Sequence, residues 1–390
     1  MIRAQYVKEN VRSIKSILEH TLLHTFNHGS HPSLSWLFLT RWMMKTLSFV
    51  LRSTTLVSVS KPQQDHIFLN DLLIAPIPIS GKLVFIRRGV LIDSSRNFLK
   101  VEDIKRILDA MSYNKLNVLH WHIVDQHSFP LKTSTYPELA DKGAYSKNWV
   151  YTEIDIRGLV CYAKDRGIFV VRYGYSAAPI SGQLNIINPK TDEIVRNLLK
   201  EVTQWFEDDF VNNKIPITWP ETLTGHLVPI GKDVAVQVWL SVADALKVVR
   251  AGYRMIATSY EKWYFDCGHG AWISDSQGNS WCNPFKSWQV AYHYDLTANM
   301  TKEGAKFVLG GEVALWSEQI DSTNLDRTLW PRGAAAAEVT WSDIKLADGT
   351  IRKTEDVFPR IHEQRARLID RNIRVDPMQP LWCARNPRNG

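Results

Sequence analysis

The sequence has 390 residues, of which 45% are hydrophobic, and a formal net charge of +7. This length and composition exclude general disorder and are enough for one large α/β domain with extensions. The positive charge is concentrated in residues 1–61, which hold eight basic residues and two acidic ones. Nucleic-acid binding requires a basic face on the folded domain itself, so we expect no nucleic-acid partner.

Residues 1–70 show no stable periodicity, and we interpret them as a basic N-terminal arm. No apolar stretch in them reaches the roughly 18 uninterrupted residues that a membrane span needs. The segment from Met44, MKTLSFVLRSTTLVSVS, is similar to a signal peptide, with a basic start, a short apolar stretch and small residues. If the true start is Met44, residues 1–43 lie upstream of the protein. We therefore expect an extracellular or secretory location.

From residue 84, short β-branched or apolar runs alternate with helical periodicity, a pattern typical of parallel α/β folds. In chain order we expect strand Val84–Asp93, helix Val101–Ser112, strand Asn117–Asp125, helix Thr152–Arg166 capped by Thr152, strand Ile168–Val171, helix Asn188–Phe206, strands Ile215–Trp219 and Asp233–Leu240, helix Ala243–Ala251, strand Arg254–Thr258, a strand within Lys306–Glu318 and helix Leu325–Trp341.

These elements include seven strands, whereas a barrel of repeated βα units has eight. Only EDDFVNNK separates the helix that ends at Phe206 from the strand that begins at Ile215. The sequence therefore predicts an α/β fold over residues 75–385, an incomplete TIM (β/α)8-type barrel. We expect it to lack the fourth strand and its helix, with interruptions near residues 172–180 and 207–214.

Polar and aromatic residues gather where the predicted strands end. In a barrel of parallel strands this rim is where active sites are built, so the pattern indicates an enzyme-like site. The residues concerned are Arg96, Asp125, Trp219, Glu221, Trp239, Tyr264, Trp316 and Glu318.

Two cysteines, Cys267 and Cys282, flank a loop rich in Gly, Ser and Asn. A disulfide between them would stabilise the fold by about 3 kcal/mol in an oxidising compartment. In a reducing compartment they would remain two unpaired thiols. Asn299, in the sequence Asn-Met-Thr, is a candidate glycosylation site.

Several segments, in the right order over about residues 75–385, resemble the β-N-acetylhexosaminidases of glycoside hydrolase family 20. The stretch that begins WYFDCG and continues to GNSWCNPFKSWQ is most similar to secreted fungal members. The segments are RGVLIDSSRNFL (88–99), MSYNKLNVLHWHIVDQHSFPL (111–131), YTEIDIRGLVCYAKDRGI (151–168), QVWL (237–240), KWYFDCG (262–268), LGGEVALWSEQID (309–321) and LWPRGAAAAEVTW (329–341).

The resemblance implies hydrolysis of terminal, non-reducing β-linked N-acetylhexosamines, such as those that end chitin oligosaccharides or glycoconjugates. Family members use a substrate-assisted retaining mechanism, in which the acetamide oxygen of the sugar attacks its own anomeric carbon. A carboxylic acid protonates the leaving oxygen, and a neighbouring Asp orients the acetamide. No cofactor is implied, and the family suggests a homodimer.

The residues that match the sugar-binding positions of the family are present. Arg96 matches the arginine that holds ring hydroxyls, and Tyr264 matches the hydroxyl donor to the acetamide oxygen. Asp266 and Glu318 match carboxylates that accept hydrogen bonds from sugar hydroxyls. Asp125 matches a supporting Asp that holds a histidine of the catalytic site. The aromatic residues that enclose the acetamide and the ring are Trp219, Trp239 and Trp316.

The catalytic motifs of the family are missing. No His-x-Gly-Gly-Asp-Glu sequence occurs, and the histidine-containing motif expected after the third strand is absent. Gly310-Gly311-Glu312 matches a different, non-catalytic position. The alternative is therefore a catalytically inactive relic or a weak sugar-binding module. The acidic pair Asp208 and Asp209 matches a turn at the opposite rim, so we assign no catalytic residue.

His120 and His122 stand at i and i+2 of a predicted strand and would share a face. Such a pair is tempting as a metal site, but no third ligand is evident in the sequence. We therefore expect no metal. The expected partner is an N-acetylglucosamine-containing oligosaccharide.

Overall fold

The computed structural model describes residues 83–173, 189–206, 216–224, 230–272 and 278–386. Contacts divide the chain into two compact units, Met1–Pro78 and Ile79–Gly390, and every described residue belongs to the second. The predicted N-terminal arm, the signal-like segment, the pair Asp208 and Asp209, and most of the two expected interruptions lie outside the described residues.

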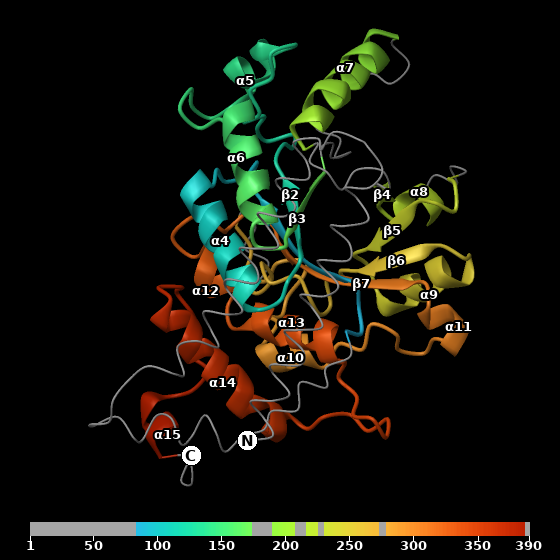
Figure 1. Ribbon diagram of the computed structural model, residues 1–390, viewed down its shortest axis with the longest axis vertical. Coiled ribbons are helices and arrows are strands. Elements are labelled where there is room, and N and C mark those ends of the chain that lie inside the picture. The colour runs from blue at the N-terminus through green and yellow to red at the C-terminus, as the bar shows by residue number, and fades with distance from the viewer. Residues whose placement is uncertain (1–82, 174–188, 207–215, 225–229, 273–277, 387–390) are drawn as a thin grey trace, which may run out of the picture. The chain divides into compact units, whose positions relative to one another are not determined.

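Seven parallel strands form one curled sheet (Figure 1). Its order is β3-β2-β1-β7-β6-β5-β4, so the first and last strands of the chain lie side by side at its centre, with Arg87 opposite Gly310. Among the described strands, β3 and β4 form the two ends. The strands are β1 (Arg87–Asp93), β2 (Val118–His122), β3 (Phe169–Tyr173), β4 (Ile217–Thr218), β5 (Ala235–Val238), β6 (Arg254–Ala257) and β7 (Val308–Leu315).

This order confirms the prediction of an incomplete barrel. The strand that the sequence lacks would follow β3 and precede β4, and those are the two strands at the ends of the sheet. The pairing of β1 with β7, which closes a complete barrel, is present. All seven predicted strands are found, although most are shorter than expected at one or both ends.

The helices cover the outside of the sheet, and several start at the caps that the sequence indicates. The side chain of Thr152 accepts a hydrogen bond from the N–H of Asp155, as predicted for an N-cap. The described helices are α4 (Val101–Tyr113), α5 (Pro137–Gly143), α6 (Glu153–Lys164), α7 (Pro189–Trp205), α8 (Glu221–Thr224), α9 (Val242–Arg250), α10 (Trp288–Tyr292), α11 (Lys302–Ala305), α12 (Leu325–Leu329), α13 (Arg332–Ser342), α14 (Thr354–Asp370) and α15 (Leu381–Arg385).

One predicted helix is wrong in its extent. We expected a continuous helix over Leu325–Trp341, but it is divided into α12 and α13 at Trp330 and Pro331. Pro331 has no N–H to donate within a helix and occupies the N-cap of α13 instead. The break therefore follows from the proline, which the apolar periodicity alone does not register.

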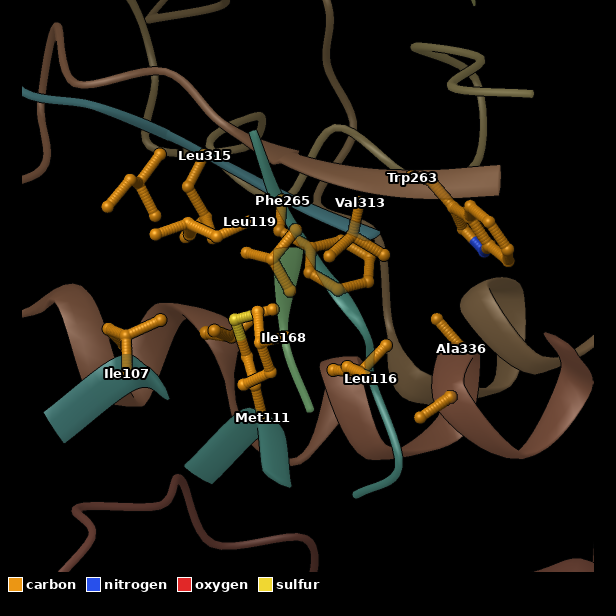
Figure 2. Packing of buried hydrophobic residues seen from close by; sticks show 14 of the residues in the cluster. Ile107, Met111, Leu116, Leu119, Ile168, Trp263, Phe265, Val313, Leu315 and Ala336 are labelled. Carbon is orange, nitrogen blue, oxygen red and sulfur yellow. The ribbon is translucent and has the colours of Figure 1, made fainter. Parts of the chain in front are cut away.

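The main hydrophobic core lies between the sheet and the surrounding helices. Successive side chains of a strand point to opposite faces, so Val313 and Leu315 of β7 face outward while Ala314 between them faces the inner side. Figure 2 shows Val313 and Leu315 packed with Ile107 and Met111 of α4. The outer face thus stabilises the fold, and the inner face is left for polar and aromatic side chains.

Candidate functional site

Arg96 is the centre of a charged cluster beyond the end of β1. Its guanidinium contacts three carboxylates: Nη1 lies 2.8 Å from Asp93, Nη2 lies 3.2 Å from Asp125 and Nε lies 3.2 Å from Glu318. The carbon of the guanidinium also lies 5.1 Å from the ring centre of Trp316. Burial disfavours the charge of Arg96, but the three carboxylates outweigh this and raise its pKa. The guanidinium of Arg96 therefore stays positively charged and is held in one position.

Asp125 joins this cluster to two imidazoles. Its Oδ2 lies 2.7 Å from His122 Nε2, and its Oδ1 lies 3.6 Å from His127 Nδ1. Burial opposes ionisation of this carboxyl, but the bond to His122 and the charge of Arg96 prevail and lower its pKa. Although the histidine that the resemblance assigns to Asp125 is missing from the sequence, its carboxylate bonds another imidazole, that of His122.

Four aromatic rings, each from a different segment, line the inner face beside Arg96. The ring centres of Trp219 and Trp316 are 6.3 Å apart, those of Tyr264 and Trp316 are 6.4 Å apart, and those of Trp239 and Tyr264 are also 6.4 Å apart. Burial raises the pKa of Tyr264 well above its usual value, so its hydroxyl stays neutral and can donate a hydrogen bond. This aromatic box can enclose a small apolar group with a polar edge.

Glu221 fixes one wall of the aromatic box. Its Oε1 accepts a hydrogen bond of 2.6 Å from Trp239 Nε1. A charge-assisted bond of this kind sets the plane of the indole more firmly than packing alone.

Asp266 lies close enough to Glu318 for the charges of the two carboxyls to interact. Its Oδ1 is shielded from solvent and has no hydrogen-bond partner among the described residues. Burial and the neighbouring charge of Glu318 raise the pKa of Asp266 to about 7, and burial also raises that of Glu318. Both carboxyls can therefore exchange hydrogen bonds with hydroxyl groups of a ligand.

A disulfide joins Cys267 to Cys282, so the two cysteines are paired. It brings Trp281 back to the site, with its ring centre 6.1 Å from that of Trp239 and 6.2 Å from that of Tyr264. Trp281 is 66% exposed and lies at the edge of the aromatic box. Sequence reasoning missed this residue, although its position next to Cys282 was the signal that could have found it.

The two histidines of β2 bond different carboxylates. His122 bonds Asp125, whereas Nδ1 of the fully buried His120 lies 2.6 Å from Glu312. Burial opposes the charge of Glu312, but His120 and Arg87 lower its pKa to about 2. Glu312 is therefore an ionised residue inside the sheet, out of contact with solvent.

Within the described ranges, one group of three metal-ligating side chains has its ligand atoms close enough together to hold an ion: Asp266, Cys267 and Cys282. Two of its three ligand atoms are the sulfurs of the disulfide, which leaves a single carboxylate. This group therefore does not offer the ligand set of a metal site.

The sequence matches the family model "Glycosyl hydrolase family 20, catalytic domain" over residues 85–173 and 210–344, more than half of the chain. The chain belongs to glycosyl hydrolase family 20. The unmatched residues between the two stretches, 174–209, include both the region after β3 and α7.

Curated relatives support the same assignment. This family 20 chain is 31% identical to a probable beta-hexosaminidase of Arthroderma benhamiae, over 80% of its own length and 68% of the relative's. It is also 31% identical to a chitooligosaccharidolytic beta-N-acetylglucosaminidase of Ostrinia furnacalis, over 83% of its length and 67% of the relative's. By family, the protein is therefore a glycosyl hydrolase, and these relatives are named as a beta-hexosaminidase and a beta-N-acetylglucosaminidase.

A solved structure also has a fold similar to that of this chain. A chitobiase structure from Flavobacterium johnsoniae superposes with a TM-score of 0.59 at 23% sequence identity, covering 74% of this chain. The family 20 chain described here spans only 52% of that protein's length. At this identity the likeness concerns the fold alone.

Every residue that we predicted to bind substrate lies among the described residues, and they gather at one end of the family 20 sheet. Arg96, Trp316 and Glu318 are in mutual contact through Arg96, and Trp219, Trp239 and Tyr264 belong to the adjoining aromatic cluster. The candidate glycosylation residue Asn299 lies elsewhere, in an exposed turn before α11.

Proposed function

We propose that the Arg96 cluster and the aromatic box together form a pocket that binds the terminal, non-reducing β-linked N-acetylhexosamine of a chitin oligosaccharide or glycoconjugate. The observation that carries the proposal is the position of Arg96, which three carboxylates hold in place beside the aromatic box. A forked, fixed donor suits two adjacent hydroxyls of a sugar, and the flat rings beside it suit the sugar face and the acetamide.

Each side chain of the pocket has a role in this proposal. Trp219, Trp239 and Trp316 enclose the acetamide and the ring, and the hydroxyl of Tyr264 donates a hydrogen bond to the acetamide oxygen. Enclosure of this kind holds the acetamide oxygen close to the anomeric carbon, as a substrate-assisted retaining mechanism requires. Asp266 and Glu318 accept hydrogen bonds from the remaining hydroxyls.

This mechanism also needs an acid that donates a proton to the leaving oxygen. The family supplies it from an Asp-Glu pair that this sequence does not contain. Loss of a general acid lowers turnover by roughly 10²- to 10⁴-fold. We therefore expect hydrolysis by this chain to be slower by about this factor than hydrolysis by relatives that contain the pair.

A second candidate function, sugar binding without turnover, has one observation in its favour. The strand that would carry the Asp-Glu pair belongs between β3 and β4, and these are the end strands of the sheet among the described residues. The sugar-binding side chains come from the other strands and loops and do not depend on that strand.

Two measurements on the full chain distinguish these functions. Titration calorimetry with N-acetylglucosamine reports occupancy of the pocket, and release of 4-nitrophenol from its N-acetyl-β-glucosaminide reports turnover. Binding with turnover that survives Asp208→Asn and Asp209→Asn supports the hydrolase, and binding without turnover supports the sugar-binding module. Absence of binding contradicts both.

We infer that the protein is secreted. The disulfide Cys267–Cys282 supports an oxidising compartment, and Asn299 is exposed and accessible to glycosylation. Among the described residues no helix is long and apolar enough to cross a membrane. Endoglycosidase treatment of protein from a secreting eukaryotic host should reduce its apparent mass, and Asn299→Gln should abolish the shift. Whether two copies associate, as the family suggests, is measured by sedimentation.

A further inference from the structure

Arg332, the first residue of α13, is a buried cation that is not among the side chains assigned to the sugar. Its residue is only 4% exposed. Burial lowers its pKa to about 10, so the guanidinium remains charged at neutral pH. Because removing a charge from water costs free energy unless hydrogen bonds replace the lost hydration, the partners of this guanidinium indicate what it does.

The guanidinium of Arg332 binds the backbone carbonyl oxygens of three separate segments. Its Nη2 donates a hydrogen bond of 2.9 Å to Phe265, and its Nη1 donates one of 3.1 Å to Lys286. Its Nε donates one of 3.1 Å to Thr328 in α12. The guanidinium carbon also lies 4.6 Å from the ring centre of Phe265 and 4.4 Å from that of Phe285. Directed bonds and two rings therefore fix this side chain.

Phe265 stands between two side chains of the proposed pocket, Tyr264 and Asp266. Its N–H donates a hydrogen bond of 2.9 Å to the carbonyl oxygen of Ala314 in β7, and its own carbonyl accepts the bond from Arg332. Both backbone polar groups of Phe265 are thus held, one by the sheet and one by Arg332. Because a peptide group is planar, holding this carbonyl also sets the orientation of the backbone that enters Asp266.

The Lys286 carbonyl that Arg332 holds belongs to the loop that carries Trp281. Within this loop, Lys286 Nζ donates a hydrogen bond of 3.1 Å to the carbonyl oxygen of Cys282. The disulfide between Cys267 and Cys282 joins the same two chain segments. Arg332 therefore connects through hydrogen bonds two segments that the disulfide connects covalently, and each segment contributes a ring to the site.

We propose that Arg332 is a positioning residue of the sugar pocket, which sets the directions in which Tyr264 and Asp266 meet the ligand. It acts through the Phe265 carbonyl and does not itself contact the sugar. This inference rests on the proposed function, which assigns Tyr264 to the acetamide oxygen and Asp266 to a sugar hydroxyl. A neutral side chain of similar length fills the same space but cannot hold the carbonyl, so the two ligand contacts lose their common alignment.

Titration calorimetry of the full chain with N-acetylglucosamine tests this role through two substitutions. Arg332→Met keeps an adaptable side chain of similar length between the rings but donates no hydrogen bond. We expect it to lower the affinity roughly tenfold, because both ligand contacts are weakened. Arg332→Lys keeps a charged donor without the planar fork, so it should restore part of the affinity that Arg332→Met loses.

Two further backgrounds separate positioning from general support of the fold. In Tyr264→Phe, and separately in Asp266→Asn, one of the two contacts that Arg332 aligns is already altered. Adding Arg332→Met should therefore lower the affinity only about threefold in each background, because residues that act through one another have non-additive effects. A merely structural role would lower the affinity by the same factor in all three backgrounds.

Arg88→Met is the matched control, because Arg88 is also a buried arginine bound to backbone carbonyls and a ring. It donates hydrogen bonds of 2.7 Å to Lys115 and 3.0 Å to Phe85, and its guanidinium carbon lies 5.1 Å from the ring centre of Trp341. Arg88 lies near the start of β1, whereas the pocket lies beyond the end of that strand. The control should lower thermal stability but leave the affinity within about twofold.

Thermal unfolding of each variant shows whether the titrated protein is folded, and Arg332→Lys replaces Arg332→Met in every background if the latter does not fold. Three results overturn the positioning role and leave the proposed function standing. They are an unchanged affinity in the Arg332 variant, an equal loss in all three backgrounds, and a loss of the same size in Arg88→Met. If N-acetylglucosamine does not bind to the unmodified chain, the proposed function fails and this inference with it.

Discussion

Arg96 shows how much of the site depends on the geometry of one side chain. Its three nitrogens each face a different carboxylate, on Asp93, Asp125 and Glu318. Lysine keeps the positive charge but offers a single point of contact in place of a planar fork. It cannot hold three carboxylates and two sugar hydroxyls in the same arrangement.

We therefore expect Arg96→Lys to lower the affinity for N-acetylglucosamine by about tenfold or more, because bidentate contacts are lost. Titration calorimetry measures the change. Arg157→Lys is the control, since Arg157 forms an exposed pair with Glu153 on α6 and should leave the affinity unchanged. An Arg96→Lys variant that binds as tightly as the unmodified chain would show that Arg96 does not contact the sugar.

Asp266 makes stability depend on pH in a direction unusual for an aspartate. Its pKa is raised from 3.8 to about 7 in the folded protein, so the folded state keeps a proton that the unfolded chain has lost. Its contribution to stability is fully present below about pH 4 and is lost as the pH rises through about 7.

Asp266→Asn removes this dependence because the amide does not titrate. We expect the variant to gain stability relative to the unmodified chain as the pH rises from 5 to 8, as measured by urea unfolding at each pH. A stability difference that stays constant over this range would contradict a raised pKa for Asp266.

Sequence motifs identified the residues of the pocket better than those of its surroundings. Arg96, Asp266 and Glu318 stand in segments with a recognisable pattern, so the sequence alone was enough to bring them to attention. Trp281 was missed because its place in the site depends on ring contacts with Trp239 and Tyr264, although the neighbouring Cys282 was a local signal for it. The disulfide returns Trp281 to the site.

Among the elements, β7 has the most constrained backbone. Opposite Met255 and Ile256 the register shifts by one residue, and Gly310 follows at φ +141°, a conformation that residues with a side chain rarely adopt. A Cβ added there would lie 1.9 Å from the carbonyl oxygen of Arg87 in β1. The glycine is thus what allows β7 to run close against β1.

Gly310→Ala should destabilise the protein by roughly 2–4 kcal/mol, because it combines a strained φ with overlap against a neighbouring strand. Gly158→Ala is the opposite control: Gly158 lies in α6 with nothing within 4 Å of an added Cβ. It should be neutral or raise stability by about 0.5–1 kcal/mol. Urea unfolding measures the stability of both variants. Equal changes in the free energy of unfolding would refute the role assigned to Gly310.

Element boundaries were predictable where a local signal exists. The cap at Thr152 and the apolar spacing of α4 fixed two helices from neighbouring residues alone. The division of α12 from α13 was not predicted from apolar periodicity, although Pro331 is a local signal for it. The long helix α14 was not predicted either, and it contains Pro359, a residue that disfavours a helix interior.

At the scale of the whole molecule, charge and binding are carried by different parts of the chain. Residues 1–61 hold eight basic residues and two acidic ones, whereas all the site residues lie after residue 83. Deleting residues 1–61 should leave the affinity for N-acetylglucosamine within about twofold and should weaken retention on a cation-exchange resin. Retention that stays unchanged would place the basic surface on the folded domain, and a lost affinity would show that the arm supports the pocket.

The pairing of β1 with β7 has a consequence for how the protein is made. The Arg87–Glu312 ion pair joins residues 225 positions apart, and His120 of β2 also depends on Glu312. While the chain is on the ribosome, the first three strands emerge long before their central neighbour has been translated. Contacts of such long sequence separation form slowly, and apolar strand faces remain open in the meantime. We expect a nascent chain that needs chaperones until its last strand is released.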